Sequence, residues 1–507
     1  MTEISFVRTE TLPELPPPVA EQGMVKWLRE NLFSSVASGI LTIVALWAIY
    51  KFSSVAVPWV ASGVWNTESL AACRDVLDGA RGACFSVLTE RWNQLLFGIS
   101  YPAEHYWRPT MAFVLLFFAA APVLFFDLPR KLLFFTGLYP FIAYWLIWGG
   151  SVFSPLGILV STVASAWVFK NSIKDGFAFS AALTTVTFVV VTTVWFWLCF
   201  DHDRPNYRFL AWLFSNAFGI YFLFSSVKWA KPEYSDNRAF VVMVGFFIIW
   251  WIFVTPQLGM KLFPVLDRIA SVSHSFSGLF LPLADFASIE AVPSRNMGGF
   301  MLNMILGTVC VSLSLPLGII LALGRQSNMP VIKAICVVFI EFIRGVPLIT
   351  LLFVANVVLS YFFPPDANID LVLRVIIMIT LFSAAYIAEV IRGGLAALPL
   401  GQYEAADSLG LDYPQAMRLI ILPQALKISI PGIVNVSVGL FKDTTLVSVI
   451  SMFDLVGAIR GPILASTEWN GVYWELFMFA SVLFFVVCYG ISQYSQWLER
   501  RLATDHR

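Results

Sequence analysis

The chain alternates between long apolar blocks and short polar stretches. A block of about 20 apolar residues crosses the ~30 Å hydrocarbon core of a bilayer as one helix. The pattern therefore predicts twelve membrane spans. Seven lie in the first half of the chain, at 34–51, 110–126, 132–149, 155–169, 177–200, 209–227 and 239–254, and five lie in the second half, at 297–324, 334–361, 371–396, 424–448 and 472–495.

These spans define the fold class and its division into regions. We predict an all-α integral membrane protein with about 12 transmembrane helices. The regions are a cytoplasmic tail (1–33), an N-terminal transmembrane region (34–254) that includes an outside segment (52–109), an outside connecting segment (255–296), a second transmembrane region of five helices (297–496) and a cytoplasmic tail (497–507).

Composition and charge support a membrane protein and exclude several alternatives. Hydrophobic residues make up 58% of the chain, charged residues 13%, and the mean hydropathy is +0.78, which is far from the values of soluble domains. Because 32 basic residues balance 32 acidic ones, net charge gives no indication of a nucleic-acid partner. The first apolar block begins near residue 34 behind a polar, proline-containing leader, so we expect no cleavable signal peptide.

The distribution of Lys and Arg predicts the orientation. The loops of one side carry more basic residues than those of the other, and by the positive-inside rule both termini are cytoplasmic. Cys73 and Cys84 then lie together in the outside segment, where an oxidising compartment permits a disulfide. Their spacing alone leaves open whether they are bonded.

The loop after the span 371–396 has the pattern of a compact helical knob on the cytoplasmic side. Ala405 and Ala406, which follow Glu404, allow another surface to approach closely, and Gly410 ends this short helix. The pair Leu422–Pro423 then begins the next segment. Local physics alone does not distinguish this knob from an ordinary connecting loop.

Charged residues inside the second transmembrane region suggest function, because an ionised group in lipid is costly. Glu341 and Arg344 are spaced i,i+3, as are Glu389 and Arg392, so each pair can share one helix face. We interpret these pairs either as part of a gate or partner contact, or as structural ion pairs that lock helix packing.

Lys442, Asp443 and Thr444 place a cation, an anion and a hydroxyl deep in an apolar stretch. Lys442 is suited to the carboxylate of a zwitterionic amino acid and Asp443 to its ammonium group. The alternative, mutual neutralisation within the helix packing, has equal weight.

No metal or nucleotide site is predicted within this chain. His105, His202, His274 and His506 are scattered, and the sequence Asp201-His202-Asp203 sits in a short predicted turn without a second histidine nearby. The chain contains no Gly-x-x-x-x-Gly-Lys-Ser/Thr phosphate-binding loop. We therefore predict a transport subunit without an ATPase site, a cofactor or a bound metal, whose energy comes from another polypeptide.

Six motifs together resemble one family. The knob, with Glu404-Ala405-Ala406, Gly410 and Leu422-Pro423, resembles the cytoplasmic coupling loop of type I ABC importer permeases. Five further blocks resemble the polar amino-acid branch of that family in the required order: NMILGT (303–308), LALGR (321–325), EFIRGVPL (341–348), YIAEVIRGG (386–394) and LFKDTTL (440–446). The likeness covers 297–507 and is strongest to general L-amino-acid permeases, whereas residues 150–296 depart from the pattern.

The resemblance implies a permease of the bacterial inner membrane that carries polar amino acids. Its implied partners are ATPase subunits that bind ATP and Mg²⁺, a second permease subunit in a heterodimer and a periplasmic amino-acid-binding protein. The leading alternative is an ion-coupled secondary transporter of small polar solutes, since twelve spans with cytoplasmic termini also suit that class. A membrane-embedded enzyme is disfavoured, because no span carries a catalytic constellation.

Overall fold

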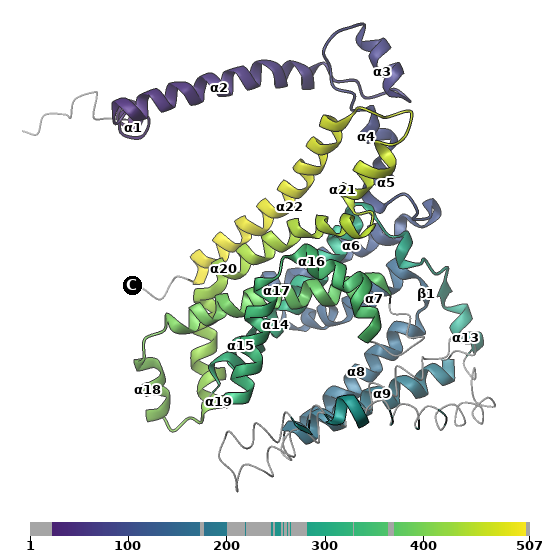
Figure 1. Cartoon of the computed structure of the whole chain (residues 1–507), viewed down its shortest axis with the longest axis vertical. Coiled ribbons are helices and arrows are strands. Elements are labelled where there is room, and N and C mark those ends of the chain that lie inside the picture. Colours follow the sequence, from purple (N-terminus) through teal and green to yellow (C-terminus); the bar gives the residue numbers. More distant parts are fainter. Residues whose placement is uncertain are drawn as a thin grey trace, which may run out of the picture. The chain divides into compact units, whose positions relative to one another are not determined.

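The computed structural model describes residues 23–172, 177–199, 281–327, 329–362 and 370–502, together with a few positions between 219 and 264. The described chain is almost wholly helical (Figure 1). It divides into two compact units, Met1–Glu90 and Arg91–Arg507. The predicted spans at 209–227 and 239–254 lie largely outside the described residues, apart from a π-helical turn at Trp250–Val254.

The first unit contains α1 (Gly23–Asn31), α2 (Val36–Ala61), α3 (Leu70–Leu77) and α4 (Ser86–Glu90). Helix α2 begins at Ser35, whose hydroxyl accepts a hydrogen bond from the Ser38 backbone N–H. It extends ten residues beyond the predicted end at 51, because the Ser53–Ser54 pair interrupts the apolar run without breaking the helix. No residue of α2 is buried in the structure, as expected for a helix that lipid surrounds.

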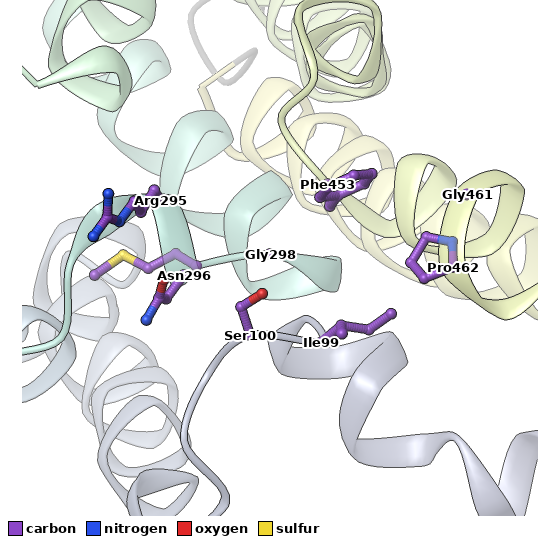
Figure 2. Close-up of a pocket in the computed structure, with 9 residues that line it drawn as sticks. Ile99, Ser100, Arg295, Asn296, Gly298, Phe453, Gly461 and Pro462 are labelled. Carbon is purple, nitrogen blue, oxygen red and sulfur yellow. The ribbon is translucent and has the colours of Figure 1, made fainter.

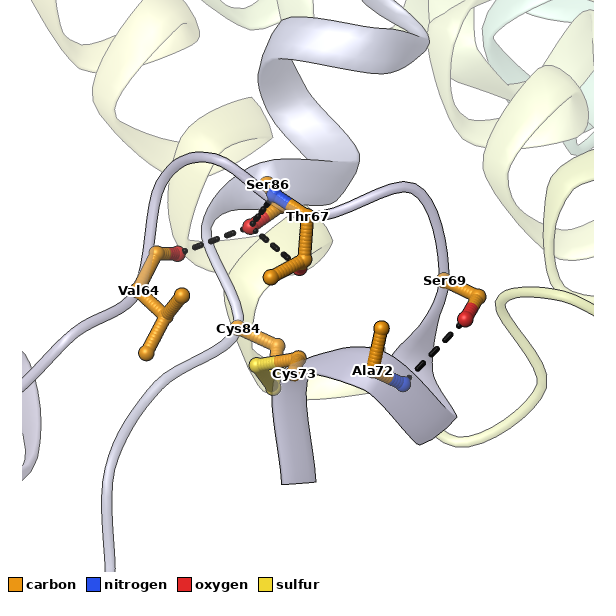
Figure 3. Close-up of a disulfide and its surroundings, with 7 residues drawn as sticks. All are labelled: Val64, Thr67, Ser69, Ala72, Cys73, Cys84 and Ser86. Atoms are coloured by element: carbon orange, nitrogen blue, oxygen red, sulfur yellow. Dashed lines mark hydrogen bonds between the residues drawn. A yellow bond between two sulfur atoms is a disulfide. The ribbon is translucent and has the colours of Figure 1, made fainter. Parts of the chain in front are cut away.

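A disulfide joins Cys73 of α3 to Cys84 and answers the question that the sequence left open (Figure 3). The Ser86 side chain lies beside it, where its hydroxyl donates to the Val64 carbonyl at 3.1 Å and accepts from the Thr67 backbone N–H at 3.2 Å. Both half-cystines are buried. The outside segment is thus a small folded motif that the disulfide closes.

The first part of the second unit contains four long helices. They are α6 (Trp107–Leu124), α7 (Leu133–Trp148), α8 (Phe153–Ser172) and α9 (Phe177–Cys199), and they follow the short α5 (Trp92–Phe97) and a 3₁₀ turn, Ala103–His105. Helices α8 and α9 pair closely, since Gly157 leaves room for the Trp195 indole, whose Nε1 donates to the Phe153 carbonyl at 2.8 Å. These helices match the bounds of the predicted spans from 110 to 200 within a few residues, and the first three are long and apolar enough to cross a membrane.

A short connection follows the undescribed region. It comprises α13 (Leu281–Phe286), strand β2 (Ser288–Ile289) and a 3₁₀ turn, Ser294–Asn296. Strand β2 pairs antiparallel with β1 (Gly150–Ser151), with Gly150 opposite Ile289. This pairing holds the connection against the α7–α8 turn.

The C-terminal core consists of α14 (Gly299–Gln326), α15 (Pro330–Gly345), α16 (Leu348–Phe353), α17 (Leu371–Ala396), α20 (Leu422–Asp443) and α22 (Tyr473–Leu502). Helix α17 packs along both α14 and α20. Gly394 permits the second contact, since a Cβ there would lie 2.6 Å from the Ala425 carbonyl oxygen. One buried cluster, which includes Leu306, Leu352 and Ile379, fills the space between α14, α16 and α17.

The predicted single span at 334–361 is wrong in one respect. Helix α15 ends at Gly345, and α16 with its π-helical continuation (Val354–Val358) leaves at an angle of 103°. Val346 adopts an extended conformation (φ −102°, ψ 132°) because the ring of Pro347 disfavours a helical residue before it. In the described part, eight helices are long and apolar enough to cross a membrane, or nine if the bent pair is one span.

Candidate coupling and translocation site

The predicted knob is a real structural element. After α17 ends, α18 (Gly401–Ser408) forms a separate short helix, and Gly410 takes a positive φ of 68° that closes it. Glu404 and Ala405 are exposed, whereas Ala406 is fully buried. The buried methyl group anchors α18 to the core and leaves the Glu404–Ala405 face free.

The chain then returns to the core through α19 (Tyr413–Ala416) and a π-helical turn, Met417–Ile421. The Asp412 carboxylate caps α19 by accepting from the Gln415 backbone N–H at 2.9 Å. Leu422 packs against a buried cluster around Ile387 and Ile421. Helix α20 begins at Leu422 with Pro423 in its first turn, as predicted, and it continues directly from the π-helical turn.

Large apolar side chains surround this knob. The most exposed are Leu400 (77%), Leu409 (72%), Leu419 (64%) and Tyr413 (59%). Leu400 and Leu409 flank α18, outside every helix that could cross the membrane. Exposed apolar side chains on both sides of a helix that carries the exposed Glu404 are suited to contact with another protein.

The four residues of the predicted ion pairs come together with a fifth that was not assigned a role. Glu389 bonds Arg392 with 2.6 Å between Oε1 and Nη2, as the i,i+3 spacing predicts. Glu341 instead pairs mainly with Arg325 of α14, at 2.7 Å between Oε1 and Nη1, and lies 4.0 Å from Arg344. Arg325 stands in the LALGR block, but its partner is 16 residues away, beyond the reach of helical spacing.

Further contacts make these five residues a single cluster. Glu389 Oε2 lies 3.4 Å from Arg325 Nη1 and 3.8 Å from Arg344 Nη1, and the Arg344 guanidinium covers the Tyr386 ring at 5.5 Å. Three arginines and two glutamates leave one excess positive charge. The cluster links the last turns of α14, α15 and α17. The last of these helices leads into α18.

The structure separates the three residues of the predicted substrate pathway. Lys442 is exposed and Asp443 half-buried at the end of α20, and among the described residues neither forms an ion pair. Thr444 is fully buried: its hydroxyl accepts from Asn303 Nδ2 at 2.9 Å and donates to the Phe441 carbonyl at 2.7 Å. Lys442 and Asp443 thus lie outside the buried network to which Thr444 belongs.

That network was missed by sequence reasoning. Asn303 of α14 also donates to Asp454 Oδ2 at 3.1 Å and accepts from the Leu455 backbone N–H at 3.1 Å. Asp454 caps the short helix α21 (Leu455–Ala458), with Gly457 N–H at 2.9 Å from Oδ1. Burial raises the pKa of the Asp454 carboxyl to about 6. The only signal in the sequence was a single Asn and a single Asp next to apolar blocks.

Comparisons with known proteins can now be set beside this geometry. The family described as "Binding-protein-dependent transport system inner membrane component" matches residues 314–504. A glutamate/glutamine/aspartate/asparagine transport system permease protein of Rhodobacter capsulatus is 44% identical over 512 residues, covering 100% of both chains. The chain belongs to the amino-acid ABC transporter permeases. The ion-coupled alternative is therefore not favoured.

Two further comparisons show how much of this permease other permeases share. An inner membrane amino-acid ABC transporter permease protein of Escherichia coli is 29% identical and covers 98% of each chain. The crystal structure of an amino acid ABC transporter with histidines has a TM-score of 0.36 and 32% identity, and covers 40% of this permease and 92% of that chain. Residues 150–296, which were predicted to depart from the family pattern, are shared with the full-length relatives.

The family also defines the general partners. ABC importer permeases work with an ATPase and a substrate-binding protein, so this permease is a transport subunit rather than an enzyme. Within the described residues, no three His, Cys, Asp or Glu side chains are grouped as metal ligands. His202 and His274 lie outside those residues.

Proposed function

We propose that this permease imports acidic and amide amino acids across the bacterial inner membrane as one half of a heterodimer. The substrates are those named for the Rhodobacter capsulatus relative, with which it shares its full length. Both termini and α18 face the cytoplasm, where a separate ATPase binds ATP and Mg²⁺. The observation that carries the proposal is α18 itself, a helix that Ala406 anchors while Glu404 and Ala405 remain exposed.

In this mechanism α18 docks on the ATPase and moves when the nucleotide-bound subunits close. The apolar residues Leu400 and Leu409 bury their exposed surface against the ATPase, and Glu404 supplies the directional polar contact. The cluster of Arg325, Glu341, Arg344, Glu389 and Arg392 ties the ends of α14, α15 and α17 together, and α17 leads into α18, so the three helix ends move as one body. Motion of α18 therefore reaches α14, α15 and α17 together.

Lys442 and Asp443 hold the part of the substrate that all amino acids share. The exposed Lys442 and the half-buried Asp443 at the end of α20 support this role, since a charged side chain in a span is costly unless it faces water or a partner. Lys442 pairs with the α-carboxylate and Asp443 with the α-ammonium group. Broad selectivity follows, because neither contact depends on the side chain of the substrate.

The test combines Glu404→Lys with Gly410→Val. The β-branched valine disfavours the positive φ at position 410, and the lysine reverses the exposed charge of α18. In the assembled transporter we expect glutamine uptake and binding-protein-stimulated ATP hydrolysis to fall at least about tenfold, with normal membrane insertion. Glu104→Lys makes the same reversal at an exposed site on the opposite side of the membrane and leaves uptake unchanged. Wild-type uptake by the double variant would refute the coupling role of α18.

A further inference from the structure

Three segments that are distant in sequence meet at the end of the core remote from α18. The Gly298 N–H donates to the Phe97 carbonyl at 3.2 Å, and the Gly299 N–H donates to the Phe453 carbonyl at 2.8 Å. A Cβ at Gly98 would lie 2.6 Å from the Gly298 Cα, so the two backbones touch directly. The N-terminal region, the start of α14 and the segment before α21 thus form one continuous seam.

If α18 is cytoplasmic, the seam lies on the outer side of the membrane. This inference therefore rests on the proposed function. Ser294, next to the seam, hydrogen-bonds to Asp370, the residue that caps the first turn of α17. The opposite end of α17 leads into α18 after 26 residues, or about 39 Å of helix. Helices α18 and α21 accordingly lie at opposite ends of the second unit (Figure 1).

A cavity of about 370 Å³ opens over this seam (Figure 2). Its walls include Ile99 and Ser100 from the N-terminal region, Arg295 and Asn296 before α14, and Phe453 and Pro462 around α21. Ile99 is 40% exposed and Phe453 50%, and both lie outside the helices that could cross the membrane. Exposed apolar side chains outside the helices that could cross the membrane indicate a contact surface for another protein.

The walls of this cavity are held rigidly. Phe453 precedes Asp454, whose carboxylate is fixed by Asn303 and by two backbone N–H groups of α21. On the other side, Arg91 pairs with Glu468 at 2.6 Å and the Trp92 ring packs on Phe479 at 5.7 Å between centroids, which fixes α5 beside α22. A preformed surface of this kind loses little conformational entropy when a partner binds.

Charge indicates what the cavity accepts. Arg295 in its lining and Arg460 nearby are exposed, and neither forms an ion pair with a described residue. No Asp or Glu lines the cavity, so a free amino acid would find no carboxylate to pair with its ammonium group. An acidic side chain flanked by apolar ones satisfies both the cation and the apolar walls.

We infer that this cavity receives an acidic, apolar-flanked loop of the substrate-binding protein and that the N-terminal region helps to recognise it. The family requires a binding protein, which must deliver its substrate on the outer side. A shorter glutamine permease of Bacillus subtilis aligns over 91% of its length with only 40% of this chain. The family match covers residues 314–504, so Ile99 and Ser100 lie outside the matched core. The wall that they form gives the N-terminal region a role in choosing the binding protein.

The test uses the complete transporter in lipid nanodiscs, with the binding protein that stimulates ATP hydrolysis by the wild-type complex. The variants Ile99→Asp and Arg295→Glu change exposed side chains that make no hydrogen bonds or ion pairs with the described residues, so we expect both to fold normally. Arg81→Glu makes the same charge reversal in the outside segment of the first unit and is the matched control. ATP hydrolysis is measured against binding-protein concentration at low and high salt.

We expect the binding-protein concentration for half-maximal stimulation to rise about tenfold in both variants. Basal hydrolysis and the saturated rate stay unchanged, and the effect of Arg295→Glu shrinks at high salt. Half-maximal concentrations equal to that of Arg81→Glu would overturn the inference, as would direct binding of glutamine to the cavity without the binding protein. Absence of any stimulation in the wild type would instead count against the proposed function.

Discussion

Replacement of Thr444 by valine distinguishes the role predicted from the sequence from the role indicated by the structure. Valine has nearly the same shape but no hydroxyl, so the buried Asn303 amide loses its acceptor at 2.9 Å and retains only Asp454 at 3.1 Å. One N–H of this amide is then buried without an acceptor, which costs about 1–3 kcal/mol. A substrate-binding hydroxyl would instead affect transport and leave stability unchanged.

The neighbouring residue provides the control. Thr445 is half-buried on the same turn, and its hydroxyl donates only to the Lys442 carbonyl at 2.9 Å. Thr445→Val removes a hydroxyl of the same kind outside the network, so its cost is below about 0.5 kcal/mol, as for substitutions away from buried networks. Thr444→Ser retains the hydrogen bonds and loses one methyl group, at about 0.8 kcal/mol.

The assay measures the thermal midpoint of the purified complex together with the concentration dependence of uptake. Each kcal/mol shifts the midpoint by about 2–4 °C in domains of 150–250 residues, so Thr444→Val lowers it by several degrees more than Thr445→Val. The KM for glutamine stays unchanged in both variants. A raised KM with an unchanged midpoint in Thr444→Val would refute the buried-network argument and return Thr444 to the substrate pathway.

Two further predictions concern residues outside the membrane spans. Burial raises the pKa of Asp454 to about 6, so the folded state keeps a proton that the unfolded chain loses near pH 4. The contribution of this carboxyl to stability is therefore fully present below pH 4 and falls by about 3 kcal/mol as the pH rises through 6. In the Asp454→Asn variant the thermal midpoint should depend less on pH between pH 5 and 7.5 than in the wild type. An unchanged pH dependence would contradict the raised pKa of Asp454. Paired Cys73→Ser and Cys84→Ser substitutions open a loop with a separation of 11 residues and cost about 3 kcal/mol locally. Hydrogen exchange in residues 62–90 should then accelerate about a hundredfold, matching the wild type under reductant; unaltered exchange would show that the motif is stable without its disulfide.

Several features could be derived from the sequence because they depend on neighbouring residues. The apolar block at 371–396 became a helix with those bounds, since hydropathy and helix propensity are sums over local residues. Gly410 adopts the positive φ that its place after a short helix predicts. The i,i+3 contact between Glu389 and Arg392 also follows from helical geometry alone.

Other features were decided by contacts that local patterns do not encode. The charges that complete the ion cluster, the acceptor that buries Thr444 and the partner of Asp454 lie between 16 and 151 residues away along the chain. Hydropathy identifies a span but not the face that packs inward, so Lys442 and Thr444, two residues apart, were read alike although one is exposed and the other fully buried. Two further contacts decide which helices meet. Backbones approach closely at glycines such as Gly394, and Pro347 turns the chain between α15 and α16. Both effects become visible only once the helices are packed together.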